Sequence, residues 1–227
     1  MFDPQTGTPL SIMDGTYITA LRTAGAAALS TRMLARTDTR VLAIIGAGVQ
    51  GRSHMTMLSR VRPFSEIRVA SRRFEYAEQL AATDSRACAV KTVEEAVRGA
   101  DVVCLCTSAS DPVISLDWIA PGMHITSVGY SPPGGELDPK VIAHGRLFVE
   151  TRMAFEPPPA GCAELSGFDP SIGTELGEVL LGRKQGRLSK EELTVYKAMG
   201  HACEDMAAAS LVYHRARQDG VGRTMAL

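Results

Sequence analysis

The residues of this chain best suited to chemistry form a glycine-rich loop, Gly46-Ala47-Gly48-Val49-Gln50-Gly51, directly after the apolar run Val41–Ile45. In dinucleotide sites the first glycine permits a tight turn, the second lets the backbone approach a pyrophosphate, and the third lets the next helix pack on the strand. A helix over residues 49–60 would direct its free N–H groups and positive dipole end at the phosphates. The pattern therefore predicts a dinucleotide site rather than a purely structural turn.

The end of the second predicted strand, residues 66–71, bears on which dinucleotide is bound. NAD-binding versions of this unit place an acidic side chain there, which accepts hydrogen bonds from the ribose hydroxyls. Here the position holds Ser71, followed by Arg72 and Arg73. A hydroxyl can donate to a 2′-phosphate and an arginine can bind it bidentately. We therefore expect NADP(H) to be favoured over NAD(H); the alternative is that both arginines lie on a solvated turn.

Metal and hydrolase chemistry are not favoured. The five histidines show no ligand spacing such as His-Glu-x-x-His, and the five cysteines include no Cys-x-x-Cys pair. Cys104 and Cys106 alternate within an apolar run, which favours buried reduced thiols in a strand. We expect His54 and His124 to be packing or surface residues. Ser131 does not lie in a Gly-x-Ser-x-Gly elbow, so the sequence predicts neither a metal site nor a serine hydrolase.

The elements that must position the loop alternate strand and helix along the chain. Predicted strands cover residues 41–45, 66–71, 88–91, 101–106, 124–129, 147–150 and 193–196. Predicted helices cover residues 49–60, 74–82, 92–99, 138–144 and 201–217. This alternation predicts an α/β fold with a Rossmann-type, doubly wound parallel sheet.

The start of the chain follows a different pattern. Residues 2–14 predict a hairpin around an Asp-Pro-Gln-Thr-Gly turn, and residues 16–35 predict an alanine-rich helix. Because a hairpin alone is marginally stable in water, we expect it to belong to a larger sheet. We therefore expect residues 1–35 to be the remnant of a second domain, 36–217 the NAD(P)-binding Rossmann domain, and 218–227 a C-terminal tail.

Composition sets the remaining bounds. The chain has 227 residues, 45% of them hydrophobic, and a formal net charge of −1, which is ordinary for a globular protein. No long basic run marks a nucleic-acid binder, and no apolar run approaches membrane-spanning length. The first residues lack the charged and apolar regions of a signal peptide. We expect a cytoplasmic protein without nucleic-acid or membrane partners.

Six motifs occur in an order that resembles one family. They are Leu21-Arg22-Thr23-Ala24, the glycine loop, Ser127-Val128-Gly129, Glu136-Leu137-Asp138, Glu175-Leu176-Gly177-Glu178-Val179 and Gly200-x-x-x-Glu204-Asp205. Over nearly the whole chain this order resembles the ornithine cyclodeaminase and mu-crystallin family, which also contains ketimine reductases and some alanine dehydrogenases. The resemblance implies a Rossmann domain attached to a second domain that binds the substrate and forms a homodimer.

The resemblance also implies roles for individual residues. It places Arg22 near cofactor and substrate, Val49 and Gln50 at the pyrophosphate, Ser71 to Arg73 at the adenosine ribose, Thr107 beside the cofactor, and Val128 and Gly129 near the nicotinamide. Ser131 and Arg22 are the candidate catalytic groups on the substrate side.

Three departures from the family pattern shape the expected function. Cyclodeaminases carry an Asp where this chain has Ser131, and a hydroxyl is a poor base without an activating neighbour, so the ketimine reductase branch is favoured. Ala198 replaces a serine of the family, which removes a hydrogen bond expected at the nicotinamide. Finally, the first residue corresponds to a point about a third of the way along a usual two-domain member. The family's Arg and Lys pair that grips a substrate carboxylate therefore maps to no residue here.

The leading hypothesis is an NADPH-dependent reductase of the C=N bond of a small, cyclic imino acid. One alternative is a truncated family member that binds NADPH or another ligand without turnover. Another is an ornithine cyclodeaminase or alanine dehydrogenase-type amino-acid enzyme that uses NAD.

Overall fold

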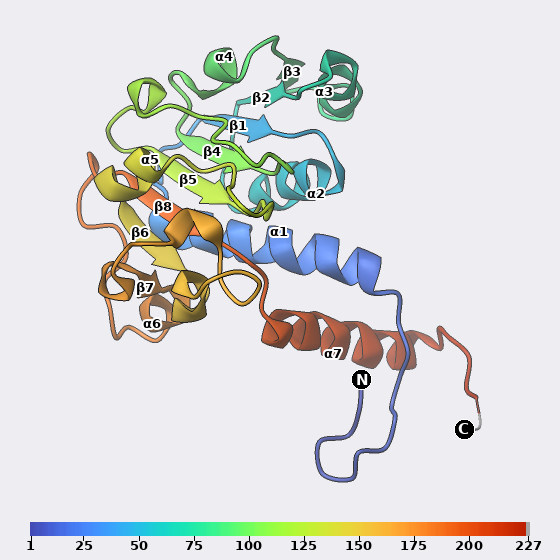
Figure 1. The fold of residues 1–227 in the computed structure, drawn as a ribbon. Coiled ribbons are helices and arrows are strands. Elements are labelled where there is room, and N and C mark those ends of the chain that lie inside the picture. The colour runs from blue at the N-terminus through green and yellow to red at the C-terminus, as the bar shows by residue number, and fades with distance from the viewer. Residues whose placement is uncertain (226–227) are drawn as a thin grey trace.

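The protein is built on one eight-stranded sheet in which all strands run parallel, seen in a computed structural model that describes residues 1–225 (Figure 1). The strands are β1 (Val41–Ile45), β2 (Glu66–Ala70), β3 (Ala87–Ala89), β4 (Val102–Leu105), β5 (His124–Ser127), β6 (Arg146–Val149), β7 (Thr174–Glu175) and β8 (Thr194–Lys197). Their order across the sheet is β3-β2-β1-β4-β5-β8-β6-β7. The predicted α/β fold with a doubly wound parallel sheet is confirmed.

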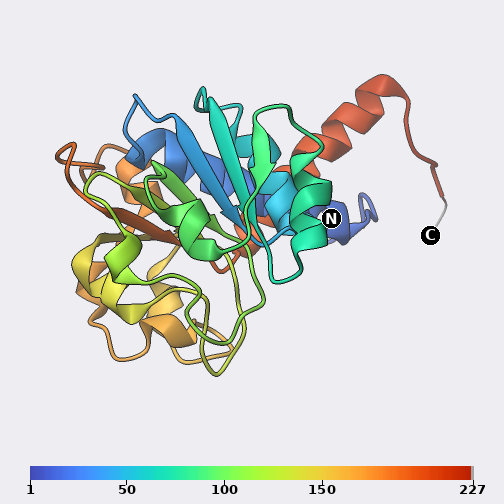
Figure 2. The same ribbon diagram turned by 90° about the horizontal axis from the view of Figure 1, so that it is seen from above.

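Helices cover both faces of the sheet (Figure 2). They are α1 (Gly15–Leu34), α2 (Val49–Leu58), α3 (Phe74–Ala81), α4 (Val93–Val97), α5 (Pro139–His144), α6 (Leu176–Leu180) and α7 (Ala202–Asp219). Alternate strand residues point to opposite faces: Ile45 and Leu105 pack with α4 and α5, whereas Ile44 and Cys104 pack with α1, α2 and α3. Burial on both faces explains why the central strands are continuous apolar runs.

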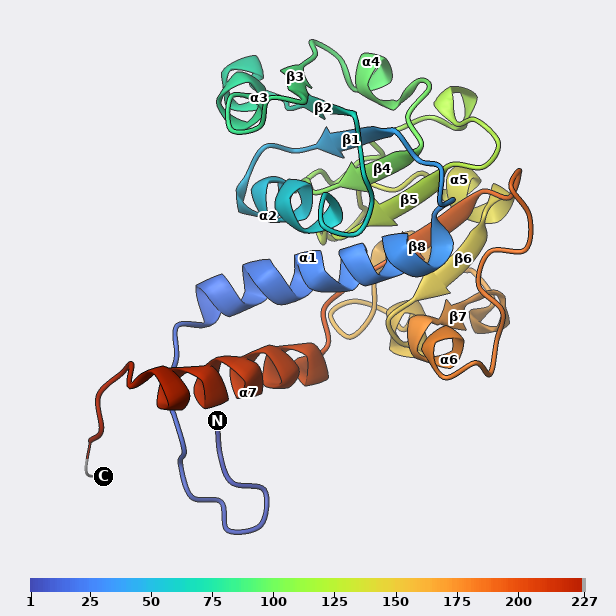
Figure 3. The ribbon, with the colours of Figure 1, turned by 180° about the vertical axis from the view of Figure 1, so that it is seen from behind.

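The long helix α1 lies across one face of the sheet, beside α2 (Figure 3). One face of α1 carries small side chains, and Ala24, Ala27 and Ala28 on it are buried. These small residues let the backbones of α1 and α2 approach closely. The Asp14 side chain accepts a hydrogen bond from Thr16 N and so caps the first turn. The predicted helix over residues 16–35 is thus confirmed to within one residue at each end.

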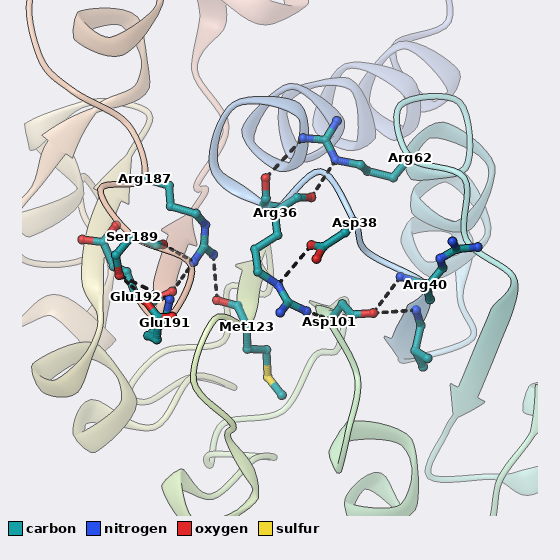
Figure 4. Close-up of polar contacts among 12 residues, drawn as sticks. Arg36, Asp38, Arg40, Arg62, Asp101, Met123, Arg187, Ser189, Glu191 and Glu192 are labelled. Atoms are coloured by element: carbon teal, nitrogen blue, oxygen red, sulfur yellow. Dashed lines mark hydrogen bonds and ion pairs between the residues drawn. The ribbon is translucent and has the colours of Figure 1, made fainter.

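A polar cluster ties the end of α1 to the amino edge of the sheet (Figure 4). Asp101 Oδ2 accepts hydrogen bonds from the backbone N–H groups of Arg40 and Val41, at 2.7 and 2.9 Å, and its Oδ1 pairs with Arg36. Arg62 Nε donates to the Arg36 carbonyl oxygen at 3.1 Å. Because Asp101 directly precedes β4, this carboxylate aligns the starts of β1 and β4.

The predicted hairpin over residues 2–14 is only partly formed. A single antiparallel bridge joins Phe2 to Pro9, and Asp3 N donates to the Thr8 carbonyl oxygen at 2.9 Å, but neither arm is a strand. Phe2 and Ile12 are exposed, so no third strand or helix among residues 1–225 covers these side chains, and an uncovered hairpin is marginal. The hairpin prediction was therefore wrong in extent, although its turn is present.

Helix α7 leaves the sheet and lies alongside the first half of α1, near the N-terminal segment (Figures 1 and 3). None of its residues is buried. The sequence assigned residues 202–217 to the Rossmann domain, but here they extend away from it with the N-terminal residues. Within the described part of the chain, no helix has the length and apolar character needed to cross a membrane.

Candidate dinucleotide and substrate site

The glycine loop joins β1 to α2 at the carboxyl edge of the sheet, where the strand order reverses between β1 and β4. Gly46 has a φ of +104°, and a Cβ there would lie 2.5 Å from the Cys106 carbonyl oxygen. A Cβ on Gly51 would lie 1.8 Å from the Gly46 carbonyl oxygen. Both positions therefore require glycine because neighbouring backbone is too close for a side chain.

Gly48 differs from these two because a Cβ on it would meet nothing within 4 Å. It is the N-cap of α2, and no side chain caps this helix end. Val49 is exposed, and Gln50 Oε1 is buried without a hydrogen-bond partner among residues 1–225. The open space at Gly48 and the uncapped N–H groups at the start of α2 suit a pyrophosphate. The unpaired Gln50 side-chain oxygen can accept a hydrogen bond from a ribose hydroxyl.

The end of β2 carries the three residues expected at the adenosine ribose. Ser71 is half-buried, while Arg72 and Arg73 are exposed. The Arg73 guanidinium carbon lies 4.0 Å from the centroid of the Tyr76 ring, a cation–π geometry. Arg72 makes no hydrogen bond or ion pair with any residue that the structure describes. Its guanidinium is thus available to an anion at this edge.

One buried carboxylate, that of Glu136, gathers the loops that follow β4 and β5. Its Oε2 accepts hydrogen bonds from Thr107 N and Thr107 Oγ1, both at 2.7 Å. Its Oε1 accepts from Gly129 N at 2.6 Å, Val128 N at 3.1 Å and Ser127 Oγ at 3.0 Å. Thr107, Val128 and Gly129 are therefore brought together, but by a residue whose role the sequence did not reveal.

Beneath this carboxylate lies a buried ammonium group, that of Lys197 at the end of β8. Its Nζ pairs with Glu164 Oε2 at 2.7 Å and donates to the Gly129 carbonyl oxygen at 2.6 Å and Ser127 Oγ at 3.2 Å. All three ammonium hydrogens are thus used. Sequence reasoning missed Lys197 and Glu164; the one available signal was a lysine ending a predicted apolar strand.

Arg22, expected near cofactor and substrate, meets the turn between β8 and α7. Its Nη1 lies 3.2 Å from Glu204 Oε2, and its Nε lies 3.1 Å from Asp205 Oδ1. Gly200 has a φ of +88°, and a Cβ there would lie 2.5 Å from Arg22 Nη1. Two family motifs far apart in the chain therefore form one ion-paired cluster, which requires glycine at position 200.

Glu150, at the end of β6, completes this cluster. Its Oε2 accepts hydrogen bonds from Met199 N at 2.9 Å and Gly200 N at 2.6 Å. Burial, with the nearby Glu150 carboxylate, raises the pKa of Glu204 to about 8, and Arg22 opposes this rise. Glu204 can therefore hold a proton near neutral pH, a property that no sequence pattern indicated.

Ser131 lies in the loop after β5, joined to Gly134 by an antiparallel bridge. A Cβ on Gly134 would lie 2.0 Å from the Ser110 carbonyl oxygen, so this loop packs directly on the loop that follows β4. The half-buried Ser131 makes no side-chain hydrogen bond within residues 1–225. It therefore has no activating base among these residues, and its hydroxyl is free to donate or accept.

Comparison with known proteins gives a consistent answer. The model of the Ornithine cyclodeaminase/mu-crystallin family matches residues 1–220. Ketimine reductase mu-crystallin of Mus musculus is 42% identical over 217 residues, which are 94% of this chain and 67% of that protein.

Solved structures agree. Thermococcus litoralis Delta(1)-pyrroline-2-carboxylate reductase, in complex with NADH and L-proline, superimposes with a TM-score of 0.92 at 33% identity, over 99% of this chain and 72% of that chain. An archaeal alanine dehydrogenase dimer with bound NAD gives a TM-score of 0.91 at 30% identity, over 100% of this chain and 72% of that chain. The resemblance inferred from six motifs is confirmed: this chain belongs to the ornithine cyclodeaminase/mu-crystallin family.

Proposed function

We propose that this protein is an NADP(H)-dependent oxidoreductase that reduces the C=N bond of a small imino acid. The observation that carries the proposal is the open cradle at Gly48, in a loop whose first glycine packs against Thr107, one of the residues that Glu136 orders. The similar structure of a reductase holding NADH and L-proline supports the same reading.

A nicotinamide cofactor, when bound, would supply hydride for the imine carbon, and the chain would have to orient the substrate and provide a proton for the nitrogen. Our candidate for holding that proton is Glu204, which contacts Arg22 and whose raised pKa, about 8, keeps the carboxyl partly protonated near neutral pH. Arg22 Nη2 is free of protein partners among residues 1–225 and is available to a substrate carboxylate. Ser131 contributes a hydroxyl that can donate a hydrogen bond to the substrate.

The preference for NADP(H) over NAD(H) is also part of the proposal. It is supported by the half-buried Ser71 where an acid would favour NAD, and by the exposed, unpaired guanidinium of Arg72. We expect Arg72→Asp to weaken NADPH binding at least about tenfold, because a charge-assisted pair becomes a repulsion, with little effect on NADH. Arg98→Asp, at an exposed site on the end of α4, is the matched control. Equal loss of both nucleotides would contradict the 2′-phosphate assignment.

A homodimer is proposed from two observations. Helix α7 has no buried residue, and it carries exposed apolar side chains such as Leu211 and Val212. The similar archaeal alanine dehydrogenase is a dimer.

A cytoplasmic location is proposed as well, because all five cysteines are free thiols, as is usual in a reducing compartment.

The first experiment titrates the purified protein with NADPH and NADH by fluorescence, followed by addition of a cyclic imino acid in the same cuvette. Selective NADPH binding, with consumption of the nucleotide after the imine is added, is the expected result. Binding without consumption would support the non-catalytic alternative. Failure to bind either nucleotide would refute the proposed site. Net formation of NADH with ammonia from an amino acid would instead favour an alanine dehydrogenase-type enzyme, and ammonia release without net NADH would favour a cyclodeaminase.

A further inference from the structure

Three side chains that the proposed reaction does not use meet beneath the glycine loop. His54 lies in α2 and Cys104 lies in β4. Cys106 directly follows β4, and its backbone carbonyl group lies against Gly46. A ring nitrogen of His54 and the two sulfur atoms all lie within 4.8 Å of one another. His54 and Cys104 are fully buried, whereas Cys106 is partly exposed and offers a path from solvent.

The tautomer of His54 is fixed by its hydrogen bond. Nδ1 lies 2.7 Å from the Gln50 carbonyl oxygen, which can only accept, so Nδ1 carries the hydrogen. Nε2 therefore keeps its lone pair, and it is buried with no hydrogen-bond partner in the described part of the chain. A second hydrogen, on Nε2, would be a buried donor without a partner among these residues, so the imidazole is neutral. A ring N–H bound to a carbonyl with the other nitrogen free is how metal-ligating histidines are held.

The two thiols have the spacing of ligands to one ion. Cys104 Sγ and Cys106 Sγ are 3.8 Å apart. Two thiolates on a tetrahedral zinc ion, each about 2.3 Å from it, would be about 3.8 Å apart. The two sulfur atoms are not joined by a disulfide: both cysteines are free thiols, and their separation is far longer than an S–S bond of about 2.05 Å. Thr126 Oγ1, 3.0 Å from Cys104 Sγ, can donate to a thiolate there.

The charge of the ligands and the apolar surroundings favour a divalent cation. The surroundings are apolar, with Ile44, Met55 and Leu58 in the same buried cluster as Cys104. Two thiolates, a neutral imidazole and a divalent cation sum to zero, which avoids burying a net charge. A monovalent ion would leave one negative charge in the core.

We propose that His54, Cys104 and Cys106 form a binding site for a divalent, thiophilic ion of the zinc class. Binding replaces the two thiol protons, which are released to solvent, and changes no oxidation state. The ion would join α2 to the end of β4 at the point where Cys106 contacts Gly46, and so would hold the cofactor loop in place.

The test is titration of the reduced, metal-free full chain with Co2+ and with Zn2+. We expect one Co2+ per chain with thiolate-to-metal charge-transfer absorption, displaced by Zn2+, and a rise in Tm with Zn2+. Cys106→Ser and His54→Gln should each weaken binding at least about tenfold, because one of three ligands is lost.

Three variants separate this site from other thiols. Cys88→Ser removes an exposed thiol, and Cys162→Ala removes a buried one elsewhere in the core. Cys203→Ser removes a surface pair, since His201 Nδ1 lies 3.0 Å from Cys203 Sγ. All three should bind as the unaltered protein does. Loss of binding in Cys203→Ser with retention in Cys106→Ser, or no binding at all, would overturn the proposal.

X-ray absorption of the unaltered protein loaded with Zn2+ gives a check that needs no variant to fold. We expect two sulfur neighbours at about 2.3 Å and one nitrogen neighbour at about 2.0–2.1 Å. A shell of oxygen and nitrogen alone would refute the site. None of these measurements depends on nucleotide binding or imine reduction.

Discussion

Lys197 is the residue on which the buried charges of the site depend. Its side chain is fully buried, as is nearly all of Glu164, and a second buried carboxylate, Glu136, shares Ser127 Oγ with it. Two acids and one base are thus enclosed in the protein interior. The amides and hydroxyls around Glu136 stabilise that carboxylate, while Glu164 relies mainly on the ammonium group.

We expect Lys197→Met to lower the free energy of unfolding by about 3–5 kcal/mol, because it leaves a buried carboxylate without its counter-charge. Urea unfolding followed by circular dichroism measures the change. Arg98→Met removes an exposed ion pair with Glu94 and should cost less than about 1 kcal/mol. A similar small loss for both variants would contradict the importance given to the buried pair.

Glu204 should make stability depend on pH. Its folded-state pKa, about 8, lies above the ordinary value of 4.5, so the folded protein binds more protons than the unfolded chain between these values. The stability contributed by the protonated carboxyl is therefore present below about pH 4.5 and lost as the pH rises through 8. Glu204→Gln should flatten the fall in unfolding free energy between about pH 5 and 8. Glu94→Gln, an exposed control, should leave the slope unchanged; an unchanged slope in both would refute the shift.

Most of these side-chain roles could not be predicted from the sequence. The family motifs include Glu136 and Glu204 but do not show what these carboxylates bind. Lys197 and Glu164 belong to none of the six motifs. The partners of these side chains lie up to 182 positions away, as Arg22 does from Glu204, and are brought near by the fold, which local patterns do not encode. The glycine loop was predictable because its motif is local, three glycines between one strand and one helix, although the carbonyl oxygen that crowds Gly46 belongs to Cys106, which follows β4.

The unit made of β1, the glycine loop and α2 is the part of the fold that the sequence predicts best, because the residues that form it are also those expected to bind the cofactor. The apolar run predicted the strand, the three glycines predicted the turn, and the helix followed within two residues of the expected end. The order of the strands was not predictable in the same way. β8 pairs with both β5 and β6, although 44 residues separate the end of β6 from its start.

Substitution of two glycines should separate folding from cofactor binding. Gly51→Ala places a Cβ 1.8 Å from the Gly46 carbonyl oxygen, so we expect a loss of stability of about 1–3 kcal/mol as α2 is displaced. Gly48→Ala meets no protein atom within 4 Å and should retain stability, yet weaken NADPH binding because its methyl group occupies the cradle. Thermal unfolding and fluorescence titration measure the two effects. Normal nucleotide affinity in Gly48→Ala would place the pyrophosphate elsewhere.

At the scale of the whole molecule, the chain consists of a closely packed sheet domain and a projecting arm made of α7, the start of α1 and the N-terminal residues (Figure 1). The arm exposes large apolar side chains, including Ile12 at 83%, Leu211 at 73% and Tyr17 at 71%. Such a surface is typical of a region that packs against another chain or domain.

If the arm forms the proposed dimer, Leu211→Asp should shift the protein toward monomer at micromolar concentrations, because it places a charge in an apolar interface. Sedimentation velocity measures the distribution of species. Leu188→Asp, at a leucine that is also exposed but lies in the loop before β8, is the control and should leave the dimer intact. A monomer in all three proteins would remove α7 as the dimer surface.

The late insertion of β8 between β5 and β6 also sets the order in which the chain can fold. Until residue 197 has left the ribosome, the facing edges of β5 and β6 lack their shared partner, and the carboxylate of Glu164 lacks its counter-ion. Open edges of this kind recruit other strands, so the nascent chain is most prone to aggregation in this interval. Contacts of such long sequence separation also slow folding, and synthesis of the last strand is therefore the step at which a chaperone would be most useful.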